Sequence, residues 1–161
     1  MQKPEPTLRT AVEDDSPAIR KLIFGILREY GLSPDPAETD SDLFDLENHY
    51  RVGWFCVMNQ GASIIGTVAL LPMDDDTWEL RKMYLHPNWR GRGYGLILLD
   101  QAIAKARILG AKRLILSTAS VLKEAIKLYK CRGFTPSSET PVADRCDQAW
   151  ALDLQQSQAS N

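Results

Sequence analysis

The residues of this chain with the clearest chemical potential form the segment Arg90-Gly91-Arg92-Gly93-Tyr94-Gly95. It follows a strand-like run that ends at Leu85 and precedes an apolar helical pattern over 96–109. Glycines at such a turn let a ligand approach the backbone, and the start of a helix presents unpaired N–H groups with a partial positive charge. The two arginines add forked donors that suit phosphate oxygens. The segment therefore predicts an anion site of the kind that binds phosphate.

Two common phosphate loops do not fit this segment. The Walker pattern requires Gly-Lys followed by Ser or Thr, which the sequence lacks. The dinucleotide fingerprint G-x-G-x-x-G begins correctly at Gly91 and Gly93 but has Leu96 at its last position. What remains is R-x-x-G-x-G, formed by Arg90, Gly93 and Gly95. Taken alone, this pattern also fits a glycine-rich turn with solvated arginines. The surrounding helices and strands are therefore needed to choose between a phosphate loop and such a turn.

The hydrophobic pattern predicts one mixed α/β domain over residues 7–154. Residues 1–6 are expected to form a flexible N-terminal tail and residues 155–161 a disordered polar tail. The expected strands are 7–12, 54–58, 63–71, 78–85, 113–117 and 148–154, and the expected helices are 16–30, 41–50, 96–109 and 121–131. A three-strand meander followed by a strand–helix–strand crossover is an uncommon order, and it restricts the choice of fold.

This order, together with the R-x-x-G-x-G loop, resembles the GNAT superfamily of N-acetyltransferases over roughly residues 7–154. The segment 125–134 also resembles that family, because Ala125-Ile126-x-Leu128-Tyr129 and Gly133-Phe134 match its A-I-x-L-Y-x-x-x-G-F helix end. The resemblance implies a single-domain GNAT-like fold with a central mixed sheet, a β-meander and about four flanking helices. It also implies an acetyl-CoA-dependent N-acetyltransferase, which transfers acetyl to a primary amine by direct attack in a ternary complex, with no metal. The alternative is a non-catalytic acyl-CoA sensor or interaction domain on the same fold.

The resemblance also assigns roles to individual residues. The pyrophosphate is assigned to the loop, and the pantetheine arm to the strand end, where a backbone N–H would stabilise the oxyanion. The residues implied for the cofactor are Met83, Tyr84, Leu85, Arg90, Gly91, Arg92, Gly93, Tyr94 and Gly95. Tyr129 is implied as the donor to the leaving thiolate. Because a phenol has a pKa of about 10 and a thiol about 8.5, full proton transfer is uphill by about 2 kcal/mol, and a hydrogen-bond role is favoured.

For the general base, the resemblance points to an acid on the meander that acts through water, and Glu79 matches best. Asp75 and Asp76, at the turn before that strand, are weaker candidates. His49 and His86 belong to the residue type that most often acts as a base near neutral pH, but they stand outside the expected strand.

The sequence departs from the family pattern at one position near the helix tyrosine. Many members carry Asn seven residues before that tyrosine, where Leu122 stands here. Lys123 is the residue that could supply a phosphate contact instead. The polar cluster 144–147 could line the acceptor site or form a turn, and the sequence leaves both open.

Charge is distributed unevenly along the chain, although the net charge is only −2. Residues 81–132 contain twelve Lys and Arg against two acids, whereas residues 29–50 contain seven acids and no Lys or Arg. A basic half suits the phosphates of CoA, and an acidic half suits an amine acceptor, either a small molecule or a lysine side chain. Nucleic-acid binding is disfavoured because the basic residues are spread over several helices and the overall charge is negative.

The remaining composition indicates an ordinary globular protein of 161 residues, 44% hydrophobic and 25% charged. No segment has the length and apolarity of a membrane span, and the first residues show no apolar signal core. The three cysteines, Cys56, Cys131 and Cys146, are an odd number without close pairing, which favours reduced thiols in the cytoplasm. A homodimer is possible by analogy with the fold.

Overall fold

A seven-stranded sheet in the order β1-β2-β3-β4-β5-β7-β6 forms the centre of the protein. The computed structural model describes residues 4–141 and 143–155. The strands are β1 (Thr7–Thr10), β2 (Trp54–Gln60), β3 (Ser63–Pro72), β4 (Thr77–Leu85), β5 (Arg113–Thr118), β6 (Thr135–Pro136) and β7 (Gln148–Asp153). Neighbouring strands are antiparallel except β4 and β5, which are parallel. The prediction of a mixed sheet that contains a meander is therefore confirmed.

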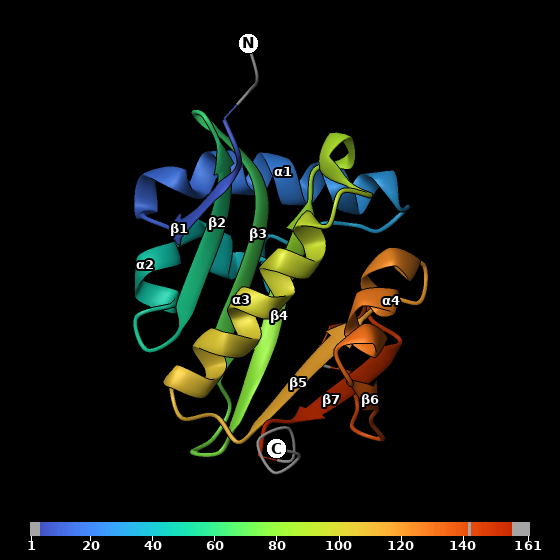
Figure 1. Cartoon of the computed structure of the whole chain (residues 1–161). Coiled ribbons are helices and arrows are strands. Elements are labelled where there is room, and N and C mark those ends of the chain that lie inside the picture. Colours follow the sequence, from blue (N-terminus) through green and yellow to red (C-terminus); the bar gives the residue numbers. More distant parts are fainter. Residues whose placement is uncertain (1–3, 142, 156–161) are drawn as a thin grey trace.

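The α-helices cover both faces of this sheet. They are α1 (Ser16–Glu29), α2 (Leu46–His49), α3 (Tyr94–Ile108) and α4 (Lys123–Cys131), with short 3-10 helices η1 (Glu13–Asp15), η2 (Ser41–Phe44) and η3 (Pro87–Trp89). In Figure 1, α3 and α4 lie in front of the sheet, and α1 and α2 lie behind it. Two apolar clusters result, one beneath α3 and α4 and one between the sheet and α1 and α2. None of the helices in the described part of the chain could cross a membrane.

The helix predicted over 41–50 is wrong as a single element. The chain instead forms η2 and α2, separated by Asp45 with non-helical φ −151° and ψ 58°. The Glu13 carboxylate accepts hydrogen bonds from the backbone N–H groups of Leu46 (3.3 Å) and Glu47 (3.0 Å), and it thereby caps a new helix start. This cap lies 33 residues away in the sequence, so local periodicity could not predict it.

The short strand β6 was not predicted, because two residues that include Pro136 carry no strand pattern. Most of the two predicted tails, residues 1–3 and 156–161, lies outside the described residues. Residues 4–6 are described and lie against the domain, since the Pro4 carbonyl accepts a hydrogen bond of 2.9 Å from Gln60 Nε2.

A β-bulge in β4 changes which face its side chains occupy. Thr67 pairs with Tyr84 and Ala69 pairs with Arg81, so Val68 stands opposite two residues, Lys82 and Met83. Lys82 has a φ of +56°, a conformation that non-glycine side chains rarely adopt. Its carbonyl accepts a hydrogen bond of 2.7 Å from Thr67 Oγ1, which fixes the bulge.

The bulge also brings two cations onto one face. Trp78, Leu80, Met83 and Leu85 belong to the cluster beneath α3 and α4. Arg81 and Lys82 instead both contact the segment that follows α1, through the Thr39 carbonyl. In a regular strand, two successive side chains would point to opposite faces.

A buried charge cluster, formed by Asp40, Lys82 and Arg145, ties three segments together. Arg145 donates two hydrogen bonds to the Asp40 carboxylate, at 2.7 Å and 2.9 Å, and Lys82 Nζ donates another. The Asp40 side chain is fully buried and that of Lys82 is 3% exposed. Burial alone would raise the pKa of Asp40, but the hydrogen bonds from Arg145 and the charge of Lys82 outweigh it and bring the pKa well below the ordinary aspartate value.

We predict that Asp40→Asn lowers the free energy of unfolding by about 3–5 kcal/mol, because it leaves Lys82 and Arg145 buried without their counter-charge. Urea unfolding at pH 7 measures the change. Asp100→Asn is the matched control, since the Asp100–Arg132 pair is exposed and such pairs contribute about 0–1 kcal/mol. Because the pKa of Asp40 is lowered by folding, its contribution is present near neutral pH and is lost as the pH falls below about 4. Equal losses in the two variants would contradict the role assigned to the cluster.

Candidate functional site

The site lies where β4 and β5 separate. Their pairing covers only Thr77 with Arg113, Trp78 with Leu114 and Glu79 with Ile115. Beyond these pairs the two strands diverge, and the opening between β4 and β5 is visible in Figure 1. The β4 edge beyond Glu79 therefore has no strand partner on the β5 side within the described residues.

The central pocket occupies this opening. Its walls come from β4, the end of β5, α4, and the segments around Thr39 and Arg145. The lining residues that bear on chemistry are Glu79, Arg81, Lys82, Tyr84, Tyr129, Arg145 and Cys146. Thus the two residues predicted to be catalytic, Glu79 and Tyr129, line the same pocket.

The loop-side pocket adjoins the central pocket, with which it shares Met83, Tyr84, Leu122 and Ala125. It runs from the end of β4 to the start of α3. Of the residues predicted to bind the cofactor, Met83, Tyr84, Leu85, Arg90, Gly91, Gly93 and Gly95 line it. The structure therefore brings together the two predicted halves of a cofactor site, the strand end and the glycine loop.

The glycine loop has a backbone that suits an anion. Gly91 and Gly93 have φ values of +77° and +89°, and Gly93 is the N-cap of α3. No atom outside their immediate chain neighbours lies within 4 Å of where a side chain would begin at either glycine, so the loop is open to a ligand. The first N–H groups of α3 have no partners within the helix, and Gly93, Gly95 and Leu96 at its start line the loop-side pocket.

Arg90 is held against the protein surface by several partners, and its side chain is 25% exposed. Its guanidinium makes a two-pronged ion pair with Glu29, at 2.7 Å and 3.0 Å, and Nε donates to the Leu85 carbonyl at 3.1 Å. The guanidinium carbon also lies 5.3 Å from the centre of the Tyr30 ring. Arg90 thus fixes the loop against α1 and the end of β4.

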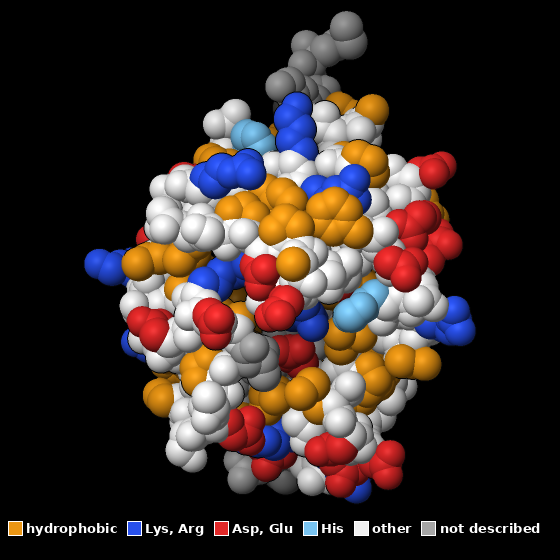
Figure 2. Space-filling view, turned by 180° about the vertical axis from the view of Figure 1, so that it is seen from behind, with side chains coloured by type: hydrophobic (Ala, Val, Ile, Leu, Met, Phe, Trp, Pro, Cys, Tyr) orange, Lys and Arg blue, Asp and Glu red, His pale blue; other side chains and the backbone are white. Residues whose placement is uncertain are grey.

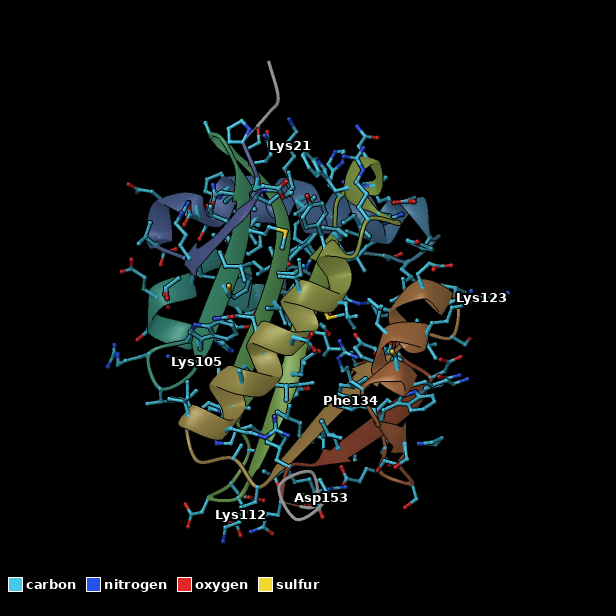
Figure 3. All side chains as sticks on the ribbon, in the orientation of Figure 1. Lys21, Lys105, Lys112, Lys123, Phe134 and Asp153 are labelled. Carbon is cyan, nitrogen blue, oxygen red and sulfur yellow. The ribbon has the colours of Figure 1, made fainter. Side chains whose placement is uncertain are left out.

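Three residues predicted to bind the cofactor do not line the loop-side pocket. Arg92 stacks over Trp89 at 5.1 Å, and the Tyr94 hydroxyl donates to Glu5 at 3.1 Å. Lys123 is exposed at the first turn of α4, and Figure 3 shows it at the outer end of that helix. Direct contacts from these three residues to a ligand remain predictions.

The Tyr129 side chain is buried, and its ring packs against Phe134 at a centroid distance of 5.7 Å. Its hydroxyl makes no hydrogen bond to any described residue, although Tyr129 lines the central pocket. Burial, with smaller contributions from Tyr84 and Cys146, raises the pKa of Tyr129 well above its ordinary value. The hydroxyl therefore stays protonated at neutral pH and can donate a hydrogen bond.

Glu79 is buried at 6% exposure and lines the central pocket. Burial raises its pKa above the ordinary glutamate value, while the charges of Arg81 and Lys82 oppose this. A carboxylate with a raised pKa is a stronger base once ionised, which suits removal of a proton from an amine.

The other residues considered as bases lie apart from Tyr129. Asp75 and Asp76 are exposed at the turn before β4, where Asp76 contacts Lys112 at 3.5 Å. His86 Nδ1 accepts the backbone N–H of Asn88. His49 lines a separate outer pocket that also includes Glu79 and Arg81.

The acidic segment 29–50 does not present all its charge to solvent. Asp40 and Asp42 are buried, and Asp42 accepts a hydrogen bond of 2.5 Å from the Tyr50 hydroxyl. Figure 2, which shows the protein from behind, has acidic and basic side chains next to one another across the middle of the view. The expectation that this segment attracts a cationic acceptor therefore does not hold for its two central acids, because Lys82, Arg145 and Arg81 lie beside them.

Sequence reasoning missed Arg81 and Lys82 as site residues, because the bulge breaks the alternation of side chains along the strand. It considered Arg145 only as part of the polar cluster 144–147, for which it left open a place at the acceptor site or a turn. Arg145 and Cys146 line the central pocket, and Asp147 fixes the turn by accepting two hydrogen bonds of 2.8 Å from Ser120.

No cluster of three or more His, Cys, Asp or Glu residues suited to a metal ion occurs among residues 4–141 and 143–155. The cysteines Cys56, Cys131 and Cys146 are free thiols.

Comparisons with known proteins agree with this geometry. The profile of the Acetyltransferase (GNAT) family matches residues 20–134. An uncharacterised N-acetyltransferase of Escherichia coli strain K12, YjgM, is 35% identical over 137 residues, which cover 80% of this chain and 81% of that protein.

Solved structures share the fold. A GNAT-family acetyltransferase of Staphylococcus aureus Mu50 has a TM-score of 0.85 at 22% identity, covering 93% of this chain and 99% of that one. YncA of Salmonella typhimurium, a putative acetyltransferase solved with its cofactor acetyl-CoA, has a TM-score of 0.72 at 21% identity, covering 92% and 94%. The chain is an N-acetyltransferase that belongs to the GNAT family.

Proposed function

We propose that this protein uses acetyl-CoA to acetylate a primary amine, by direct attack within a ternary complex. The observation that carries the proposal is the meeting of two adjacent pockets at the β4–β5 opening, one lined by the glycine loop and one by Glu79 and Tyr129. A long donor can lie in the first pocket with its acyl end in the second. YncA, which shares the fold, was solved with acetyl-CoA.

The donor would bind chiefly through backbone groups. The N–H groups at the start of α3 would hold the pyrophosphate, and the open edge of β4 near Met83–Leu85 would pair with the amides of the pantetheine arm. Arg90 supports the loop through Glu29 and adds positive charge beside the phosphates. The apolar side chains Leu122, Ala125 and Leu128 would cover the arm from the α4 side.

The reaction requires one bond to form and one to break. The amine nitrogen attacks the acetyl carbonyl carbon, and the carbonyl oxygen takes up negative charge, which a backbone N–H of β4 would stabilise. The amine proton passes to Glu79, directly or through water. The C–S bond then breaks, and the leaving thiolate accepts a hydrogen bond from the Tyr129 hydroxyl. The thiolate finally takes its proton from water, because the raised pKa of Tyr129 disfavours full proton transfer from the phenol.

The acceptor and the compartment are also proposals. We place the amine, from a small molecule or a lysine side chain, in the central pocket beside Glu79. Three free thiols agree with a cytoplasmic protein.

The first test is release of free CoA thiol from acetyl-CoA in the presence of a panel of amines. We expect turnover with at least one amine class, and thermal stabilisation of the protein by acetyl-CoA alone. Stabilisation without turnover on any amine would favour the sensor alternative. Absence of both would contradict the proposed donor.

Gly93→Ala should weaken acetyl-CoA binding by about tenfold or more, because it strains a left-handed backbone position in the phosphate loop. Gly110→Ala is a closely matched control. Gly110 has the same φ of +89° and the same open surroundings, but it follows α3 at the opposite end. Both variants should lose about 1 kcal/mol of stability. Only Gly93→Ala should raise the Kd for acetyl-CoA, measured by calorimetry.

Tyr129→Phe should lower kcat by about 10- to 100-fold, as expected when a hydrogen bond to a developing negative charge is lost. The affinity for acetyl-CoA should change little, because the ring and its packing on Phe134 are retained. Steady-state kinetics and acetyl-CoA titration measure the two effects. An unchanged kcat would remove Tyr129 from the mechanism.

The pH profile of kcat/KM for the acceptor should fall on the acid side as Glu79 is protonated. Because burial raises the pKa of Glu79, activity should be present above that pKa and lost below it, at a pH higher than the ordinary glutamate value of about 4.3. Glu79→Gln should lower kcat/KM by about 100-fold and remove this acid limb. Retention of the limb in Glu79→Gln would assign it to another group.

A further inference from the structure

We propose that the acceptor carries a carboxylate next to its amine, as an amino acid does, and that Arg81 binds this carboxylate in the central pocket. The inference rests on the proposed acetyl transfer and names the substrate class of that site.

Arg81 keeps unused hydrogen-bonding capacity at the pocket wall. It lines both the central and the outer pocket, and its side chain is 22% exposed. Among residues 4–141 and 143–155, its one hydrogen bond is to the Thr39 carbonyl, at 3.3 Å. Its ion pairs with Glu79 (3.5 Å) and Asp42 (3.6 Å) are longer than good hydrogen bonds, and its buried Nε has no partner among the same residues.

Arg145, in the same wall, has a guanidinium whose hydrogen-bond donors are already used by a carboxylate. It donates two hydrogen bonds to the Asp40 carboxylate at 2.7 Å and 2.9 Å. A guanidinium carries five N–H donors in a fixed fork that matches a carboxylate. Arg81 is thus the guanidinium of this wall that is available to a ligand.

The arrangement of charge matches a zwitterion. Glu79 and Arg81 present a carboxylate and a guanidinium 3.5 Å apart. An ammonium beside Glu79 would place a carboxylate on the neighbouring carbon close to Arg81. A bound amino acid would then place its ammonium within hydrogen-bond distance of Glu79 and its carboxylate within hydrogen-bond distance of Arg81.

The rest of the wall disfavours a second cation. Among the described residues that line the central pocket, Glu79 is the one carboxylate, whereas Arg81, Lys82 and Arg145 are cations. Lys82 and Arg145 are already paired with Asp40. A second ammonium of a polyamine would therefore find no further carboxylate in this wall, whereas an anion beside the amine would find Arg81.

The test compares each proteinogenic L-amino acid with its carboxamide and its decarboxylated amine, using thiol release from acetyl-CoA by the full-length protein. For the best amino acid, we expect kcat/KM to exceed that of its carboxamide by about 10- to 100-fold, the range for a charge-assisted hydrogen bond.

Variants at Arg81 then assign the effect to this residue. Arg81→Gln should lower kcat/KM for the amino acid by about 10- to 100-fold, mainly through KM, and Arg81→Lys should restore part of the loss. The carboxamide should lose less than about threefold, because it lacks the charge that Arg81 binds. Arg132→Gln is the control, since Arg132 forms an exposed pair with Asp100 and lines neither pocket. Equal losses on amino acid and carboxamide in Arg81→Gln would overturn the role of Arg81.

A binding measurement separates this inference from the proposed reaction. Thermal shift of the CoA-saturated wild-type protein is recorded with each amino acid and its carboxamide. Stabilisation by the amino acid alone, without thiol release, would support the carboxylate site and contradict the proposed transfer. Carboxamides or decarboxylated amines that react as well as amino acids would overturn the carboxylate site and leave the transfer intact. Neither stabilisation nor reaction with any amino acid would overturn the carboxylate site.

Discussion

The buried charge cluster of Asp40, Lys82 and Arg145 is the constraint on which the site depends. Its members come from the segment after α1, the bulge of β4 and the turn before β7. A buried charge without its partner costs several kcal/mol, so the three segments are stable only when all three are in place. Lys82 and Arg145 also form part of the wall of the central pocket. The bulge, with Lys82 at φ +56°, is the local strain that this assembly stabilises.

The sequence predicted those parts of the fold that depend on neighbouring residues. The order of elements follows from local periodicity, and the glycine loop was found as a short motif between two predicted elements. The roles of Met83–Leu85, Glu79 and Tyr129 came from the resemblance to the family, and the structure places these residues in the walls of the two adjacent pockets. The break between η2 and α2 was missed because Glu13, far away in the chain, caps the second helix. Arg81 was missed and the place of Arg145 was left open because a bulge and a long-range ion pair position them, and neither leaves a periodic pattern.

The two adjacent pockets differ in their chemistry, and this division fits the two substrates proposed. The loop-side pocket is lined largely by apolar side chains and backbone, with the start of α3 at its far end. The central pocket has charged and hydroxyl-bearing side chains in its wall, together with apolar ones. A flexible, mostly apolar arm with a charged end suits the first, and a small polar amine suits the second. Tyr84 and Leu122 stand at the boundary, because both line each pocket.

The short pairing of β4 with β5 has a mechanical consequence. Only three residue pairs join the half-sheet β1–β4 to the half-sheet β5–β7–β6. The backbone of a long ligand lying along the open edge of β4 would act as a substitute strand across this seam. The enzyme would then be structurally complete only while it holds its donor, and departure of CoA would loosen the same junction that supports Tyr129. Transient separation of the two half-sheets would then couple product release to the shape of the acceptor pocket within each catalytic cycle.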